Sequence, residues 1–254
     1  MQSNAQESFV YNDKSLDDLE LVTVATRTDV FYPTSTTVLL LRAVRTSVES
    51  TTASVLDLGC GCGIVGIVLA KRLNCVPLLF ASDICERAVK LTKKNALFHD
   101  LKIDCRQGNT FEPWSGMKFD LIVEDVSAIS EPIAELSSWY KPPIVNHAGS
   151  DGTRWVVRIL SEAREYLCDG GQMFFPVLSL SNEIKILDEA QRRFRIVTLH
   201  QEQWYPLSGD LLVAQDYLLE LADKGIIRLE KRGSRWCWSS RIYSAAVPVV
   251  HNHC

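Results

Sequence analysis

The chain has 254 residues, 46% hydrophobic and 23% charged, and its 27 basic and 31 acidic residues give a formal net charge of −4. These proportions are typical of a globular protein and exclude a mainly disordered chain, a collagen and a coiled coil. An acidic excess argues against binding to phosphates, so we expect no nucleic-acid partner. Without a long apolar run or a secretory signal at the start, we expect no membrane association and a cytoplasmic location.

Short apolar runs alternate with helix-length segments along most of the chain. This alternation predicts βαβ units and a doubly wound α/β fold, with a Rossmann-like sheet of seven mainly parallel strands and a C-terminal antiparallel hairpin. In chain order we expect strand Ser54–Leu58, helix Ile64–Leu73, strand Leu78–Ser82, helix Ile84–Phe98, strands Ile103–Gln107 and Phe119–Val123, helix Gly152–Leu167, strand Gln172–Val177, helix Asn182–Phe194, strand Arg195–Gln201, helix Leu211–Lys224, and a hairpin of Ile226–Glu230 with Trp236–Ala246.

No linker or internal repeat divides the chain, so we expect residues 30–254 to form a single domain, with residues 1–29 as an extension or lid. The eight cysteines include no C-x-x-C pair. Reduced, buried thiols are therefore expected, and no metal site.

A glycine-rich turn follows the first predicted strand. Gly59, Gly61 and Gly63 alternate with other residues, which allows a tight turn and a close backbone approach to a ligand at the next helix start. Asp83 ends the second strand, where a carboxylate can accept the hydroxyls of a ribose. Asp57, before the first glycine, favours a ligand with an ammonium group over a pyrophosphate. The alternative is a structural turn, with Asp83 as a helix cap.

These residues lie in stretches that resemble a known family. D-L-G-C-G-C-G, A-S-D-I-C-E-R-A-V-K-L-T-K-K-N-A, Q-G-N-T-F and F-D-L-I-V are similar to motifs of class I S-adenosylmethionine-dependent methyltransferases, in the branch of the release-factor glutamine methyltransferases. The resemblance covers residues 30–180 and implies S-adenosylmethionine as the cofactor. The positions it assigns to cofactor binding are Phe31, Pro33, Thr37, Asp57, Gly59, Gly61, Gly63, Asp83, Ile84, Asn109 and Asp125.

The chain departs from that branch after the fourth strand. The resemblance implies N-P-P-Y or D-P-P-Y here, but the chain has Glu124-Asp125-Val126-Ser127-Ala128. Asp125 occupies the first motif position, and we predict that it orients the acceptor or accepts its proton, with Glu124 and Ser127 as further catalytic candidates. Because side chains alternate along a strand, only one of the two acids is expected to face the site. The alternative is that these acids cap the next helix.

Aromatic pairs occur in two segments expected above the same sheet edge. We predict that Trp139, Tyr140, Trp204 and Tyr205 contact the substrate through their ring faces, together with Asn146. The alternative for each ring is ordinary packing. Arg228, Lys231, Arg232 and Arg235 make a basic hairpin that we interpret as a solvated turn.

Only 30 residues precede Phe31, which is too few for the helical recognition domain that the resemblance implies. We therefore expect methyl transfer to a small-molecule acceptor of specialised metabolism, by a monomer or homodimer. Three alternatives stay open: attack on the methionine chain or intramolecular cyclisation that releases methylthioadenosine, methylation of protein or RNA nitrogen, and an inactive cofactor-binding partner subunit.

Overall fold

The computed structural model describes residues 7–16, 20–48, 52–73, 78–144 and 146–248. Its strands are β1 Ser8–Tyr11, β2 Val22–Ala25, β3 Ser54–Leu58, β4 Leu78–Asp83, β5 Ile103–Gln107, β6 Phe119–Glu124, β7 Leu167–Leu178, β8 Phe194–Pro206, β9 Glu230–Arg232 and β10 Arg235–Pro248. Its α-helices are α1 Ser35–Ser47, α2 Ile64–Arg72, α3 Glu86–Phe98, α4 Glu131–Leu136, α5 Arg154–Glu162, α6 Glu183–Arg193, α7 Gly209–Val213 and α8 Gln215–Asp223.

The central sheet has the order β5-β4-β3-β6-β7-β10-β8, and the short β9 pairs with β10. Strands β3 to β7 pair in parallel, whereas β10 runs antiparallel to both of its long neighbours, β7 and β8. The predicted α/β fold, with a mainly parallel sheet and a C-terminal antiparallel pair, is confirmed. Counting β9, the sheet has eight strands rather than seven.

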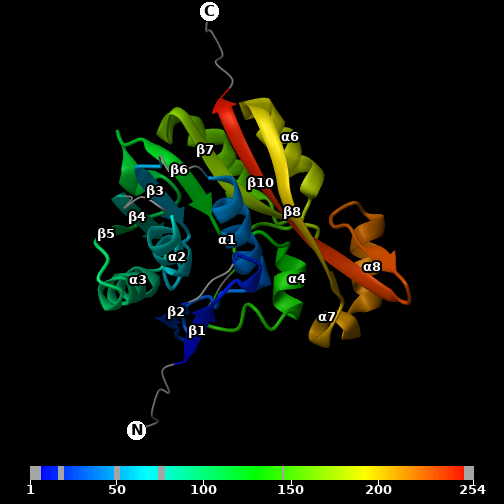
Figure 1. Cartoon of the computed structure of the whole chain (residues 1–254). Helices are drawn as coiled ribbons and strands as arrows, with labels where there is room; N and C mark the ends of the chain where they lie inside the picture. The colour runs from blue at the N-terminus through cyan, green and yellow to red at the C-terminus, as the bar shows by residue number, and fades with distance from the viewer. Residues whose placement is uncertain (1–6, 17–19, 49–51, 74–77, 145, 249–254) are drawn as a thin grey trace, which may run out of the picture.

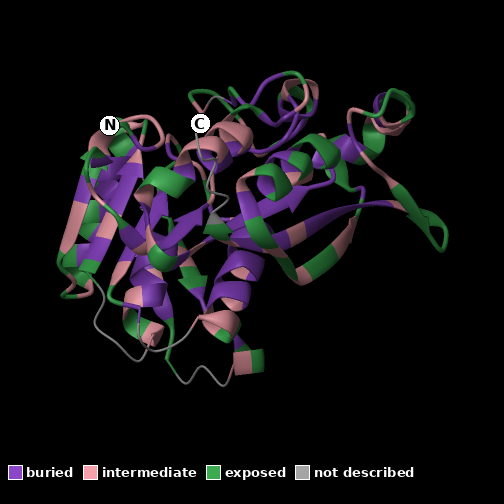
Figure 2. Ribbon diagram, turned by 90° about the horizontal axis from the view of Figure 1, so that it is seen from above, coloured by how far each residue is buried: buried purple, intermediate pink, exposed green. Residues whose placement is uncertain are grey.

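Helices cover the sheet on both faces (Figure 1). Apolar residues of α1, α2 and α3 form one buried cluster with one side of the sheet, and those of α4, α5, α6, α7 and α8 form a larger cluster on the other side. Strand β3 contributes to both clusters, through Val55 on one face and Leu56 on the other, because successive side chains alternate. Seen from above, buried residues occupy the sheet and the inner helix faces (Figure 2).

Two predicted helices differ from the structure. The helix expected to end near Leu167 is α-helical to Glu162 and continues as a 3-10 turn over Ala163–Tyr166, before Leu167 begins β7. Within β7, Gly170 has φ +80°, and a Cβ on Gly171 would lie 3.0 Å from the Phe119 carbonyl oxygen, so the two glycines fit an irregular stretch of strand beside β6. The helix expected over 211–224 is divided at Ala214 into α7 and α8.

The first strands form a hairpin against α3. The Asn95 side chain accepts from the Ala25 backbone N–H (3.0 Å) and donates to the Ala25 and Cys62 carbonyl oxygens (2.9 and 2.8 Å). One amide of α3 thus joins the hairpin to the glycine turn. Residues 1–6 and 17–19 of the expected lid, together with Cys75 and Cys254, lie outside the described residues.

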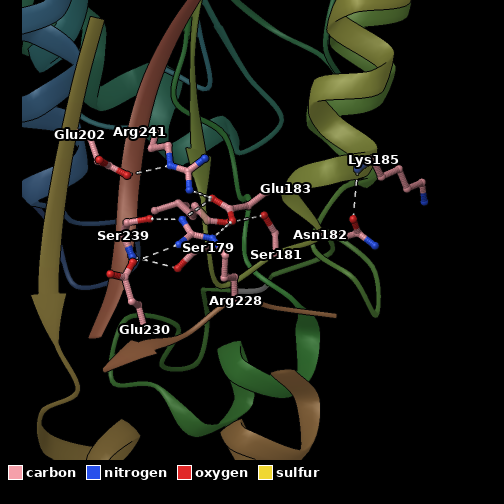
Figure 3. A network of polar contacts seen from close by, with 11 residues as sticks. Ser179, Ser181, Asn182, Glu183, Lys185, Glu202, Arg228, Glu230, Ser239 and Arg241 are labelled. Carbon is pink, nitrogen blue, oxygen red and sulfur yellow. Dashed lines mark hydrogen bonds and ion pairs between the residues drawn. The ribbon is translucent and has the colours of Figure 1, made fainter. Parts of the chain in front are cut away.

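A network of charged side chains fastens the C-terminal strands to α6 (Figure 3). The Arg228 Nε donates to Glu183 Oε2 at 2.7 Å, and Arg241 lies 3.4 Å from the other oxygen of that carboxylate. Arg228 also donates to the Ser239 hydroxyl on β10 (3.1 Å). Glu183 is buried, so these contacts compensate its loss of hydration and fix the start of α6.

Within the described ranges, no helix combines the length and the apolar character that a membrane span requires. Nor do the described histidines, cysteines and acids form a group of three or more arranged to hold a metal ion.

Candidate functional site

A cavity of about 870 Å³ opens at the carboxyl ends of β3, β4 and β6. Ligands of open parallel sheets bind at this edge, because the loops after the strands converge there. Segments far apart in the sequence line it: residues 29–37 before and within α1, the glycine turn, the loops after β4, β5 and β6, and residues 138–140, 143, 144 and 147. The cavity therefore depends on the whole fold.

The glycine turn lies beneath this cavity. Gly59, Gly61 and Gly63 have φ values of +77°, +54° and +83°, which residues with a side chain rarely adopt. A Cβ on Gly59 would lie 2.8 Å from Val126 Cγ1, and one on Gly63 would lie 2.9 Å from Thr92 Cγ2. Gly59 and Gly61 line the cavity, whereas Gly63 begins α2 behind them.

Asp83 holds this turn in place. Its Oδ2 accepts from the Gly61 N–H (2.9 Å) and its Oδ1 from the Cys85 N–H (2.8 Å). Burial raises the pKa of Asp83, and the two backbone hydrogen bonds oppose the rise. Each carboxylate oxygen keeps a further acceptor position, which suits a pair of ribose hydroxyls. If Asp83 were only a helix cap, that role would account for its contact with the Cys85 N–H before α3 but not for its contact with the Gly61 N–H.

The residues around Asp83 fit a nucleoside. Ile84, 63% exposed, and Asn109 line the cavity on that side. A Cβ added to Gly61 would contact only the Phe31 carbonyl oxygen, at 3.7 Å. Because glycine has no Cβ, the space above its backbone is open to the cavity, and we call this space the cradle. Phe31, Pro33 and Thr37 form its opposite wall.

Asp57 does not reach the cavity wall. Its Oδ2 accepts from the Gly66 N–H in the first turn of α2 (3.0 Å), and its other oxygen is buried without a described partner. Burial raises the pKa of Asp57 to about 7. The carboxyl thus supports the turn from behind, and contact with an ammonium group stays a prediction.

Asp125 does line the cavity, at the point where β6 ends. Thr37, in the first turn of α1, donates from its hydroxyl to Asp125 Oδ2 (2.7 Å). Burial raises the pKa of Asp125 to about 6, against the lowering effect of the Thr37 hydrogen bond. Ser127 also lines the cavity.

The neighbouring acid points elsewhere, as the strand alternation predicts. Glu124 is fully buried away from the cavity wall, where one oxygen accepts from the Val126 N–H (3.2 Å) and the other has no described partner. Burial raises its pKa well above the usual range for a glutamate. A raised pKa and full burial indicate that the Glu124 carboxyl is neutral and has a structural role.

Half of the predicted aromatic contacts are at the site. Trp139 and Tyr140 line the cavity, and the Tyr140 ring lies 5.0 Å from that of Phe31. Tyr205 does not line the cavity; its ring stacks on that of Trp238, which does (4.7 Å between centroids).

Two further candidates lie outside the cavity. Trp204 faces the opposite side of β8 from Tyr205 and packs under the guanidinium groups of Arg228 and Arg232. The Asn146 side chain is occupied by the Ile129 carbonyl (2.9 Å) and the Ala148 N–H (3.0 Å), so it orders its own loop.

Sequence reasoning missed several lining residues. Trp155 and Trp238 reach the cavity from α5 and β10, inside runs that read as ordinary helix and strand. Asp29 and Arg87 line it as an ion pair (3.3 Å) that joins the segment before Phe31 to α3. The apolar periodicity predicted their elements, but no local signal marked these side chains as cavity residues.

Comparison with known proteins identifies similar chains. Residues 22–126 match the model of the methyltransferase small domain. A release factor glutamine methyltransferase of Geobacter sulfurreducens is 34% identical over 125 residues, 47% of this chain and 43% of that protein. A tRNA1(Val) (adenine(37)-N6)-methyltransferase of Actinobacillus pleuropneumoniae is 26% identical over 54% of this chain and 56% of that protein.

A solved structure shows the same fold. A 16S rRNA N2 methyltransferase of T. thermophilus, in complex with AdoMet and guanosine, superposes with a TM-score of 0.58 at 16% identity, over 95% of this chain and 50% of that one. This chain spans about half the length of the curated relatives it matches.

These findings confirm the predicted family, and they correct the predicted partners. We expected a small-molecule acceptor and no nucleic acid, but relatives named as release factor, ribosomal protein and tRNA methyltransferases, and the 16S rRNA methyltransferase structure, carry the names of protein or RNA substrates. The expectation failed because net charge describes the whole surface, whereas an acceptor in a macromolecule enters a cavity with only one residue.

Proposed function

This chain belongs to the class I S-adenosylmethionine-dependent methyltransferases, and from that premise we propose that it methylates a nitrogen atom of a protein substrate. The observation that carries the proposal is the position of Asp125, a carboxylate on the cavity wall where the acceptor would meet the methyl donor. When bound, S-adenosylmethionine supplies an electrophilic methyl group. Orienting the acceptor, removing its proton and excluding water are then tasks for the chain's own residues.

The donor end of the cavity is the glycine turn with Asp83. Gly61 presents its backbone without a side chain, and the Asp83 carboxylate is aimed by two N–H groups. The hydroxyls of a ribose would bind this carboxylate, with the base beside Ile84 and Asn109. The methionine part would extend over Gly59 and Gly61 towards Asp125.

The acceptor end is formed by Asp125, Ser127 and Tyr140. The Ser127 side chain is hydrogen-bonded with that of Tyr140, whose pKa burial raises to about 12, so that its hydroxyl stays protonated. A carboxylate and two hydroxyls suit a nitrogen acceptor that has protons to donate. The names of the similar proteins, which include release factor and ribosomal protein glutamine methyltransferases, favour a protein as its carrier.

The test follows the methyl group. Purified enzyme is incubated with methyl-tritiated S-adenosylmethionine and an extract of the source organism, and portions are digested with ribonuclease or with protease. We expect S-adenosylhomocysteine as the product, and label that survives ribonuclease but is released by protease. Label sensitive only to ribonuclease would contradict the proposal and favour RNA, and methylthioadenosine would show attack on the methionine chain instead.

A further inference from the structure

The acceptor end of the cavity carries uncompensated negative charge. The charged lining residues are Asp29, Asp83, Arg87 and Asp125. Arg87 is paired with Asp29, which Arg27 also contacts at 2.7 Å. Among the described residues no cation lies within ion-pair distance of Asp125, whose carboxylate receives the Thr37 hydroxyl. This end of the cavity therefore attracts a cation and repels a phosphate.

Aromatic rings line the same cavity as Asp125, and the nearby Asp125 charge contributes to the raised pKa of Tyr140. We name as the aromatic box five aromatic residues of the lining: Phe31, Trp139, Tyr140, Trp155 and Trp238. Four of these rings contact each other in pairs, with Trp139 at 5.6 Å and 67° from Trp238, and Tyr140 at 5.0 Å and 38° from Phe31. Ring faces attract an ammonium ion, most strongly where water is displaced.

The polar groups of the box discriminate between nitrogen types. An ammonium group has only donors, and Asp125 and the hydroxyl oxygens offer acceptors. A planar amide also brings a carbonyl oxygen that needs a donor, and the hydrogen bond between Ser127 and Tyr140 leaves one of their two O–H groups for it. A neutral amide would nevertheless leave the charge of the buried Asp125 carboxylate uncompensated, whereas an ammonium group neutralises it.

Building on the proposed function, we propose that the acceptor is a primary ammonium group of a protein, held by Asp125 inside the aromatic box. Its source is a lysine side chain or a chain N-terminus, both of which bring the same group on a slender stem. The substrate class of this chain is then set by the aromatic box, in place of the N-P-P-Y or D-P-P-Y loop that residues 124–128 replace.

The reaction moves one proton to Asp125 and one methyl group to the acceptor nitrogen. The ammonium gives one proton to the Asp125 carboxylate, and the lone pair of the resulting amine forms a bond to the methyl carbon. The bond from that carbon to sulfur breaks with its electron pair left on sulfur, which gives S-adenosylhomocysteine and a methylated ammonium. Burial favours the proton transfer, because it raises the pKa of Asp125 and lowers that of an enclosed ammonium.

Defined probes test this inference. The protein is saturated with S-adenosylhomocysteine, and Nα-acetyl-lysine amide, Nα-acetyl-glutamine amide or a lysine-free peptide with a free N-terminus is added. Binding is followed by tryptophan fluorescence, since three tryptophans line the box. We expect a saturable signal with at least one of the two amine probes and about tenfold weaker binding of the glutamine probe. The amine probe that binds shows whether the acceptor is a lysine side chain or a chain N-terminus.

Two variants and a control complete the test. Asp125→Asn and Trp139→Leu should each weaken amine binding about tenfold, measured at S-adenosylhomocysteine concentrations that saturate each variant in a thermal-shift titration. Trp204→Leu, whose ring lies outside the cavity, should leave amine binding unchanged. Equal binding of the glutamine probe, or amine binding insensitive to both cavity variants, would overturn the inference.

The residue labelled in the extract experiment separates the two proposals. Label on lysine or an N-terminus supports both. Label on glutamine leaves the proposed function standing and contradicts the ammonium acceptor, whereas absence of labelled protein contradicts the proposed function itself.

Discussion

The Thr37 hydroxyl donates a 2.7 Å hydrogen bond to Asp125, 88 residues away in the sequence. The same oxygen accepts from the Thr34 N–H, as part of the capping box that begins α1. One side chain therefore starts a helix on one face of the sheet and aims the carboxylate at the end of β6.

Replacing Thr37 by valine removes both contacts at nearly constant volume. We expect a loss of about 1–2 kcal/mol in unfolding free energy, measured by denaturant titration. The hydrogen bond lowers the pKa of Asp125, so its loss should raise that pKa above about 6 and move the acidic limb of kcat/KM to higher pH. Thr46→Val, the same change on an exposed face of α1, should shift neither.

Asp83→Ala should abolish the rise in melting temperature that S-adenosylhomocysteine produces, because the ribose acceptor and the support of the glycine turn disappear together. NAD should give no rise with the unaltered protein. Asp104→Ala on the exposed part of β5 serves as the control and should keep the shift. A full shift in the Asp83 variant would remove the ribose assignment.

Gly61→Ala and Gly225→Ala form a matched pair, since both glycines have positive φ (+54° and +69°) and an added Cβ would clash at neither. Each should cost about 1 kcal/mol of stability from backbone strain. Only the alanine at 61 projects into the cavity, so only that variant should weaken binding of S-adenosylhomocysteine in calorimetry. Equal weakening in both would mean that strain, not the cradle, controls affinity.

The raised pKa of the Asp57 carboxyl predicts that the free energy of unfolding depends on pH. Its folded pKa of about 7 lies above the unfolded value near 3.8, so the folded state holds a proton that the unfolded state releases between these values. The contribution is complete below pH 3.8 and is lost as pH rises through 7, with a slope of up to about 1.4 kcal/mol per pH unit. Asp57→Asn should flatten this part of the unfolding curve between pH 5 and 8. An unchanged slope would place the titration elsewhere.

Arg228→Met should destabilise the protein by about 1–3 kcal/mol, because the buried Glu183 loses its 2.7 Å ion pair and, of the cations in the described part of the chain, keeps Arg241 at 3.4 Å. Lys90→Met breaks an exposed pair with Glu86 on α3 and should change stability by less than about 0.5 kcal/mol. Similar effects for the two variants would argue against a structural role for the network in Figure 3.

The sequence by itself determined the sheet, the glycine turn and the position of Asp83 beside that turn, because each depends on a local pattern. Apolar periodicity over a few residues sets strand or helix, and the alternate glycines allow positive φ wherever the chain folds. Asp83 was predictable for the same reason. It ends the strand that follows the glycine turn and helix α2, and adjacent parallel strands bring its carboxylate next to that turn.

Only the tertiary structure decided which side chains share the cavity. Asp57 lies in a correctly predicted strand, and Glu124 extends by one residue the strand predicted to end at Val123, but the pleat turns both carboxyls away from the cavity wall. Trp204 and Tyr205 were equivalent in sequence, and the alternation along β8 directs one to Arg232 and the other to Trp238. Trp155 and Trp238 join the site from distant elements because α5 and β10 pack around the same sheet edge, a long-range contact that no local pattern encodes.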